Sequence, residues 1–412
     1  MKTKTSLILQ IAAAALAVAI PCSAQPSFVS GSTGSDGALD FSSVPSGQTV
    51  VFDPTTYNPP LNPSHNNIFN FTTINIPSGV TVRLSGRKLT GPVYWLATGA
   101  VTIAGTLDLK GEDGAIATNV AANRTIAYPG AGGYAGGLGG QIGVATASAG
   151  QGPAAGIAGT TAQNPYGGSG GFTGNSFLVP LIGGSGGGGS MNYSGSYGIN
   201  SGYYGTGGGA GGGAILVASS TSISCTGLIN AKGGDGPYGY PYYYPAAGGG
   251  GGAIHLVAPA ISGTCGLYVN GGGSTSTNGA QGRIRVESGN YTGTFGFVGP
   301  YTITATPNLY LPTTSGGTIK AISVNGVSLP ASPTGSFATP DVSINTSNSV
   351  PIVIQASNIP VGTAVTLQIT SDQGSDMIIT CPALSGTLAS STTTATVAFP
   401  AGFSRGIITA SW

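Results

Sequence analysis

Charged residues are scarce in this sequence. Lys and Arg number 12 and Asp and Glu number 11 among 412 residues, so only 6% of the chain is charged. An ordinary soluble domain carries roughly 25%. Nucleic-acid binding needs a basic patch or stripe, and the sequence contains no such cluster of Lys or Arg. The composition therefore excludes DNA and RNA as partners.

The sequence also lacks the motifs of common catalytic and metal sites. It has two His and four Cys, and their spacing matches no zinc site. No phosphate-binding loop or G-x-S-x-G nucleophile elbow occurs in a suitable context. The sequence places no carboxylate or serine beside His255, so a catalytic triad is unsupported. We therefore expect no enzyme activity, no catalytic residue and no cofactor.

A long apolar run occurs only at the N-terminus. Lys2 and Lys4 precede an apolar run over 7–20, and 22–24 (Cys-Ser-Ala) has the small residues of a cleavage site. This pattern is typical of a secretory signal peptide, predicted over residues 1–24. A lipoprotein acylated at Cys22 is the alternative. The run is too short for a membrane span of about 20 residues, so we expect a secreted or cell-surface protein with no transmembrane segment.

Glycine dominates what the sequence does contain, with 74 residues. Glycine-bracketed segments of similar sequence recur at 100–114, 211–236 and 250–273, with a partial copy at 282–287. Self-similarity of this kind signals a solenoid. Apolar residues alternate within each copy, which is the period of a strand. The pattern predicts an all-β fold, a right-handed parallel β-helix.

The alternation also predicts which side chains point inward. The expected inward column is formed by Ile215 and Val217, Ile254 and Leu256, and Ile284 and Val286. In the third copy we favour a one-residue deletion that turns Leu267 and Val269 inward. The other register would bury Asn270, and an unpartnered polar group costs a few kcal/mol on burial. On the outer face, His255 would then lie between Leu216 and Arg285.

Two cysteines support stacking of the copies. Cys225 and Cys265 occupy nearly the same place in successive copies. Stacked coils would bring their Cα atoms within the disulfide range of about 4.4–6.8 Å, and export makes the bond chemically permissible. We predict this disulfide, with two buried free thiols as the alternative, and a buried, unpaired Cys381.

A glycine-rich insertion covers about residues 115–210. Over 130–139, glycine recurs at every third residue, which is the period of an extended left-handed helix. Glycine at each contact position lets such helices pack closely. Packed polyglycine helices and a disordered low-complexity loop are both compatible with the sequence.

A shorter insertion over 237–245 is rich in tyrosine. Solvent-facing tyrosines stack on sugar rings or on another protein, so we expect this loop to contact a glycan or a cell-surface or matrix component. The alternative is that the rings cover the end of the glycine-rich layer. The candidate contact residues are Tyr238, Tyr240, Tyr242, Tyr243 and Tyr244.

Two aspartates form the candidate metal site. Asp113 and Asp235 occupy equivalent positions in the first and second copies, and stacked carboxylates could bind Ca²⁺. Lys110 and Lys232 are equivalent in the same way, so an ion-pair ladder is the competing interpretation. Acid–base catalysis by the paired carboxylates is a weaker third interpretation.

Three domains are expected. The signal peptide (1–24) precedes a β-helix domain (25–300), whose first strands, near 49–52, 69–74 and 80–84, would cap the solenoid. From 301 to 412 glycine brackets give way to short alternating runs separated by proline and glycine turns. Six such runs predict an immunoglobulin-like β-sandwich.

The segments GPVYWLATGAVTIAGTLDLKGEDG, GGGGGAIHLVAPAISGTCGLYVNGGG and GAQGRIRVES resemble a family of exported bacterial glycine-rich proteins with pectate-lyase-like parallel β-helix repeats. The likeness covers roughly residues 30–290 and implies secretion and architecture, but no catalytic residues. The long insertion separately resembles the packed polyglycine helices of some phage adhesin tips.

We therefore expect a non-enzymatic structural or adhesive protein, a rigid scaffold that displays contact loops and is capable of self-assembly. A carbohydrate-active lyase or hydrolase is the alternative. An ice- or mineral-binding surface is a third interpretation, which would need a regular threonine face.

Overall fold

The computed structural model describes residues 28–411 except 62–65, 116–124, 141–145, 161–163, 192–204, 238–243, 276, 313–316, 331–332, 334–338, 372–374 and 400–404. The predicted signal peptide lies outside the described residues. Within them, no helix is both long and apolar enough to span a bilayer.

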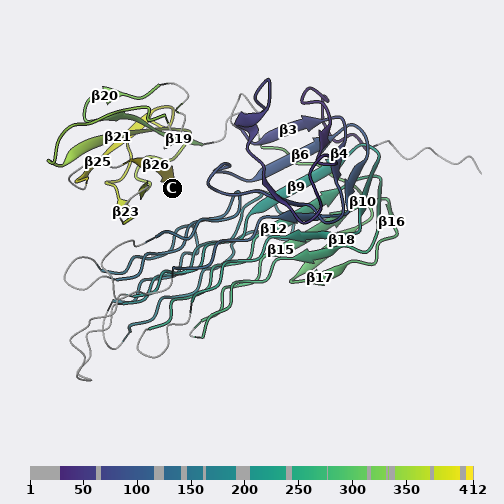
Figure 1. Cartoon of the computed structure of the whole chain (residues 1–412), viewed down its shortest axis with the longest axis horizontal. Helices are drawn as coiled ribbons and strands as arrows, with labels where there is room; N and C mark the ends of the chain where they lie inside the picture. Colours follow the sequence, from purple (N-terminus) through teal and green to yellow (C-terminus); the bar gives the residue numbers. More distant parts are fainter. Residues whose placement is uncertain are drawn as a thin grey trace, which may run out of the picture.

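Three parallel sheets of six strands stack into a β-helix-like solenoid (Figure 1). Sheet A consists of β1 (Leu39–Asp40), β4 (Ile74–Ile76), β7 (Val101–Ile103), β10 (Ser222–Cys225), β13 (Ala260–Ser262) and β16 (Asn290–Tyr291). Sheet B consists of β2 (Thr49–Val51), β5 (Thr81–Arg83), β8 (Thr106–Asp108), β11 (Leu228–Asn230), β14 (Gly266–Tyr268) and β17 (Gly296–Val298). Sheet C consists of β3 (Ile68–Phe71), β6 (Val93–Ala97), β9 (Ala214–Ser219), β12 (Ala253–Val257), β15 (Arg283–Glu287) and β18 (Tyr301–Thr304).

The strand register confirms the predicted inward column. Ile215 pairs with Ile254, which pairs with Ile284. All six predicted inward side chains are fully buried in one apolar core. In β14, Leu267 pairs with Ile229 and is buried, as is Val269, while Tyr268 is exposed. The predicted one-residue deletion is therefore correct.

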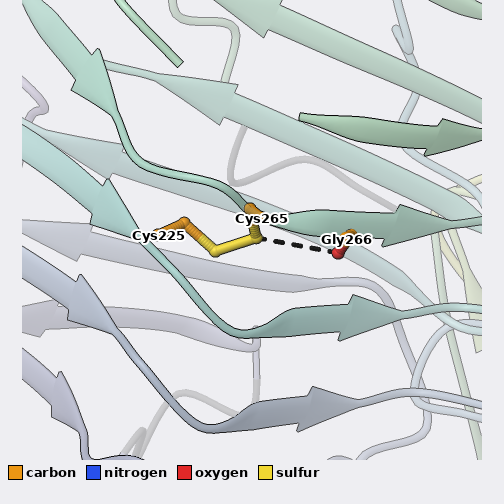
Figure 2. Close-up of a disulfide and its surroundings, with 3 residues drawn as sticks. All are labelled: Cys225, Cys265 and Gly266. Atoms are coloured by element: carbon orange, nitrogen blue, oxygen red, sulfur yellow. Dashed lines mark hydrogen bonds between the residues drawn. A yellow bond between two sulfur atoms is a disulfide. The ribbon is translucent and has the colours of Figure 1, made fainter. Parts of the chain in front are cut away.

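The predicted disulfide is present. Cys225 and Cys265 are bonded to each other with their Cα atoms 5.1 Å apart (Figure 2). Both side chains are fully buried where adjacent coils turn from sheet A toward sheet B. Cys381 is free and buried, as expected.

The glycine-rich segments extend from the corner between sheets B and C as parallel rods (Figure 1). We call the described residues of 109–115, 125–140, 146–160, 164–172, 183–191, 205–213, 231–237, 244–252 and 269–282 the glycine array. Residues 130–139 belong to it, so the structure favours packed polyglycine helices over a disordered loop for that stretch.

One central rod, 183–191, shows how the array is held together. Three consecutive N–H groups, of Gly187, Gly188 and Gly189, donate to three different neighbours at 2.8–3.0 Å, namely to the carbonyls of Gly209, Gly168 and Ser148. Their three carbonyls accept from the N–H groups of Gly137, Ala247 and Gly159, and Gly159 lies in the arm of 146–160 that returns beside Ser148 after the turn at 152–154. The rod thus bonds to neighbours on six sides with a three-residue period, as expected for packed extended helices.

Two antiparallel sheets form the C-terminal domain and share one apolar core. The five-stranded sheet has the order β20 (Val327–Ser328), β19 (Thr318–Val324), β21 (Val350–Ser357), β25 (Ser391–Val397) and β24 (Ser385–Gly386). The three-stranded sheet has the order β23 (Met377–Thr380), β22 (Thr366–Ser371) and β26 (Gly406–Ser411). Each of the six predicted runs corresponds to one of these strands.

The C-terminal domain contacts the glycine array directly. Ile378 of β23 packs against a small apolar cluster of array residues, Ile126, Tyr128, Ala135 and Leu138. Gln368 of β22 and Gln151 of the array are hydrogen bonded at 3.3 Å. The array therefore joins the solenoid to the C-terminal domain.

Candidate functional site

The predicted Asp–Lys ladder forms at the corner where coils leave sheet B. Lys110 Nζ lies 2.8 Å from Asp113 Oδ1, and Lys232 Nζ lies 2.9 Å from Asp235 Oδ1. The backbone connects the two pairs, because Asp235 N donates to Asp113 Oδ1 at 2.7 Å. Gly273 N of the next coil donates to Asp235 Oδ1 at 2.6 Å. Each aspartate therefore accepts a backbone hydrogen bond from the coil that follows it.

The electrostatics of Asp235 follow from these contacts. Burial alone would raise the pKa of its carboxyl, but hydrogen bonds from Lys232 and from the backbone of Gly273 outweigh burial and lower the pKa. Within the described residues, no group of three or more His, Cys, Asp or Glu side chains is arranged to hold a metal ion. The geometry favours the ion-pair interpretation of the ladder, and calcium binding stays a prediction.

Of the five candidate tyrosines of this loop, one lies within the described residues. Tyr238, Tyr240, Tyr242 and Tyr243 lie outside the described residues. Tyr244 is described and half-buried, and its ring meets that of Tyr166 edge to face at 5.6 Å. Tyr166 is 45% exposed and was not among the predicted contact residues. A partly exposed aromatic pair is therefore built from two separate insertions.

The aromatic pair lies at the end of the array that is distant from the sheets. The carbonyl of Tyr244 accepts a hydrogen bond from Thr206 Oγ1 at 2.9 Å. Thr206 precedes β9, which begins at Ala214, by eight residues. At about 3.1 Å per residue, the tyrosines lie about 25 Å from the end of sheet C.

A second polar cluster, which the sequence did not predict, lies on the outer face of sheet C. Leu216 and Arg285 flank His255 in the register, as expected. However, His255 Nε2 is also 3.2 Å from Glu287 Oε1, so the expectation that no carboxylate accompanies this histidine was wrong. Glu287 lies two residues after Arg285 on the same strand and therefore on the same face. That two-residue spacing was the available signal.

Two chain segments cover this cluster. Arg285 hydrogen bonds to Glu287 and donates from Nη1 to the carbonyl of Ser176 at 3.2 Å. The other carboxylate oxygen of Glu287 accepts from Asn308 N at 2.6 Å. The cluster therefore ties both the 172–181 segment and the segment after β18 to sheet C. The surrounding apolar contacts come from Leu178, Leu181, Leu309 and Leu311.

Burial and hydrogen bonding act in opposite directions on the charge states of the cluster. It lowers the pKa of His255 below its ordinary value and outweighs the opposite effect of Glu287. Burial would raise the pKa of the Glu287 carboxyl. Hydrogen bonds from His255 and Arg285 outweigh this effect, so the pKa of Glu287 is lowered. Neutral His255 thus faces an ionised Glu287 that Arg285 balances. Both His255 and Glu287 are about 1% exposed, so the described cluster holds chain segments in place without presenting its groups to solvent.

Comparison with known proteins places the chain in no established family. No family model matches its sequence, and no curated protein or solved structure matches it. The likeness to exported glycine-rich proteins therefore stays a prediction from the residues alone.

Proposed function

We propose that this chain is a non-enzymatic, secreted or cell-surface structural protein that makes adhesive contacts. The solenoid and the glycine array serve as a rigid body. The tyrosine-bearing end of the array is the contact surface for a glycan or a matrix component. The C-terminal domain is an attachment or spacer module.

The packing of the glycine array carries this proposal. A Cβ atom added at Gly188 would lie within about 2 Å of the carbonyl oxygen of Ile157, and most other array glycines are equally tight. Much of the interior is therefore backbone packed directly against backbone. Backbone hydrogen bonds on six sides make a rod bundle that resists bending, which suits a spacer that must hold a contact surface away from its base.

The end of the array has suitable chemistry for adhesion. Tyr166 and Tyr244 present ring faces and edges with polar hydroxyls, and such rings combine a large apolar area with hydrogen bonding. Few charges lie nearby in the sequence, so an uncharged glycan is the partner that fits best.

Export is the location that fits the chemistry. Disulfides form and persist in oxidising compartments and are rare in the cytosol. The bond between Cys225 and Cys265 supports the predicted signal peptide, and with it the proposed membership in the exported glycine-rich proteins.

Two finer features of the fold belong to the same proposal. Parallel strands joined by crossovers are right-handed in about 98% of cases, which supports right-handed winding of the solenoid. The shared core of the two antiparallel sheets supports an immunoglobulin-like sandwich for the C-terminal domain.

The test is binding of the purified chain to immobilised polysaccharides with and without Ca²⁺, scoring both retention and cleavage products. We expect retention without cleavage, lost in the Tyr166→Ser/Tyr244→Ser double variant. Tyr310→Ser is the control, because Tyr310 is also an exposed tyrosine, 54% exposed against 45% for Tyr166, but lies in the segment after β18. Calcium-dependent cleavage would favour the carbohydrate-active alternative. Equal retention of both variants would contradict the role of the tyrosine pair.

A further inference from the structure

The two ends of the solenoid differ in how far other residues cover the apolar core. At the N-terminal end, Phe41 and Phe52 are buried. The short 3-10 helix η1 (Pro54–Thr56) and the side chains of Tyr57 and Leu61 pack near them. An ion pair between Lys88 and Asp53, 2.7 Å long, fixes the start of η1. This end is capped, as solenoid ends generally are.

The C-terminal end is open. Strands β16, β17 and β18 are the last strands of sheets A, B and C, and Figure 1 shows them at the free end of the stack. After β18 the described residues 305–312 do not fold over this end. They turn back along sheet C, where Asn308 N bonds to Glu287 and Leu309 packs on the outer face of the sheet.

Aromatic side chains occupy the core positions of this last coil. Tyr291, Phe297 and Tyr301 pair in register with the buried residues Ile261, Leu267 and Ile284 of the coil below. They continue the inward columns, and among the described residues no further strand pairs beyond them. The rings of Phe297 and Tyr301 stack with centroids 4.1 Å apart, and Tyr301 is 55% exposed. The end of the core therefore presents a layer of partly exposed rings.

The backbone at this end is also unprotected. An edge strand leaves a row of N–H and C=O groups that can pair with another chain, and proteins commonly block such edges with charged side chains. Residues 288–304 contain no charged residue. The three terminal strands thus combine free edges, aromatic surface and neutrality.

We propose that the C-terminal end of the solenoid is a dimer interface, occupied by the same end of a second copy of this chain. In a two-fold contact, residues near the axis face their own copies, so a charged residue there would meet a like charge. The absence of charge over 288–304 satisfies that condition. A two-fold axis across the end sets each terminal strand antiparallel to a strand of the other copy and covers both ring layers.

The capped N-terminal end argues against a head-to-tail arrangement. A head-to-tail contact needs two different complementary surfaces and generates rings or filaments. Here Phe41 and Phe52 are already buried within their own chain. The interface is therefore isologous and closes at two copies, with the glycine arrays of both copies held in one particle. This inference rests on the end of the solenoid and is independent of the tyrosine pair.

The experiment compares two valines in one outward column of sheet B. Val298 lies on β17 at the open end and is 40% exposed, and Val51 lies on β2 at the capped end and is 48% exposed. We expect the purified chain to sediment at twice its monomer mass. Val298→Glu should sediment as a monomer, because a charged side chain on an edge strand blocks its pairing with another chain. Val51→Glu should remain a dimer.

Thermal unfolding monitored by circular dichroism checks that Val298→Glu is folded, and small-angle scattering checks that the wild-type particle is joined end to end. A wild-type chain that stays monomeric at micromolar concentrations would overturn the proposal. So would a Val298→Glu chain that stays dimeric, or a series of larger species that Val51→Glu abolishes.

Discussion

The carboxylate of Asp376, in the C-terminal domain, accepts a hydrogen bond of 2.8 Å from the backbone N–H of Ile126, 250 residues earlier in the glycine array. Its other oxygen accepts from Ser371 N at 2.8 Å. The side chain is 4% exposed, and burial raises the pKa of its carboxyl. One buried carboxylate thus connects a loop of the domain to a rod of the array.

Replacing this carboxylate should loosen the joint. Asp376→Ala leaves the buried N–H of Ile126 without this acceptor and also removes the hydrogen bond to half-buried Ser371. An unsatisfied buried group costs about 1–3 kcal/mol. We expect faster proteolysis between the array and the C-terminal domain, and a broader distribution of sizes in small-angle scattering. Lys320→Ala, at an exposed position on β19, is the control and should behave as wild type. Identical digestion patterns for the two variants would show that the apolar contact of Ile378 suffices.

The buried His255 cluster should make the fold sensitive to acid. The pKa of His255 is lowered from 6.5 in the folded chain, so below about pH 6.5 the unfolded chain binds a proton that the folded chain refuses. Stability should fall by about 1.4 kcal/mol for each pH unit over which this difference persists. The lowered pKa of Glu287 has the same sign and adds a loss below about pH 4.5.

The measurement is the midpoint of thermal unfolding at pH 7.5 and at pH 5. His255→Leu places the residue found at the equivalent position of the coil below, Leu216, and should flatten the decline between those pH values. His65→Leu changes the other histidine and should leave the decline intact. An unchanged decline in His255→Leu would assign the acid sensitivity to other groups.

A Gly→Ala substitution should lower the free energy of unfolding at an interior glycine of the array and leave it nearly unchanged at a surface glycine. In Gly188→Ala the new Cβ meets the carbonyl of Ile157 at about 2 Å, and overpacking of this kind costs about 1–3 kcal/mol or more. In Gly273→Ala the nearest atom is Asp235 Oδ1 at an ordinary 3.6 Å, so little change is expected. Chemical denaturation gives both free energies of unfolding. Equal values would mean that the array is not close-packed.

Loss of the disulfide should destabilise the solenoid. The bond closes a loop with a sequence separation of 40, for which the chain-entropy model gives about 4 kcal/mol. We expect Cys225→Ala/Cys265→Ala to unfold at a markedly lower denaturant concentration than the oxidised wild type. Cys381→Ala should keep the disulfide, since Cys381 is free, so a reductant should still lower the denaturation midpoint of this variant. A reductant should lower the midpoint of the wild type but not that of the double variant.

The solenoid was predictable because the sequence of each copy indicates how its strands pair with those of the next copy. Alternation marks the inward residues, and the cost of burying Asn270 identifies the deletion near Cys265. Strand period and copy-to-copy alignment are local properties, and they were enough to place Ile254 over Ile215 and Cys225 beside Cys265.

The array and the polar cluster were harder to predict, each for a different reason. The glycines have no side chains, so nothing in the sequence says which rod lies beside Gly188. The partners of Glu287 include Asn308, in a segment that returns across sheet C, and a strand pattern does not predict that return. Tyr166 meets Tyr244 only because two separate insertions end at the same place.

The three-residue hydrogen-bond cycle of rod 183–191 has a consequence for how such a protein can change length. Adding three residues to every rod of the array keeps each donor with its former neighbour and advances the loops by about 9 Å. The reach of the contact surface is therefore adjustable in fixed increments, while the solenoid, its disulfide and its end remain unaltered.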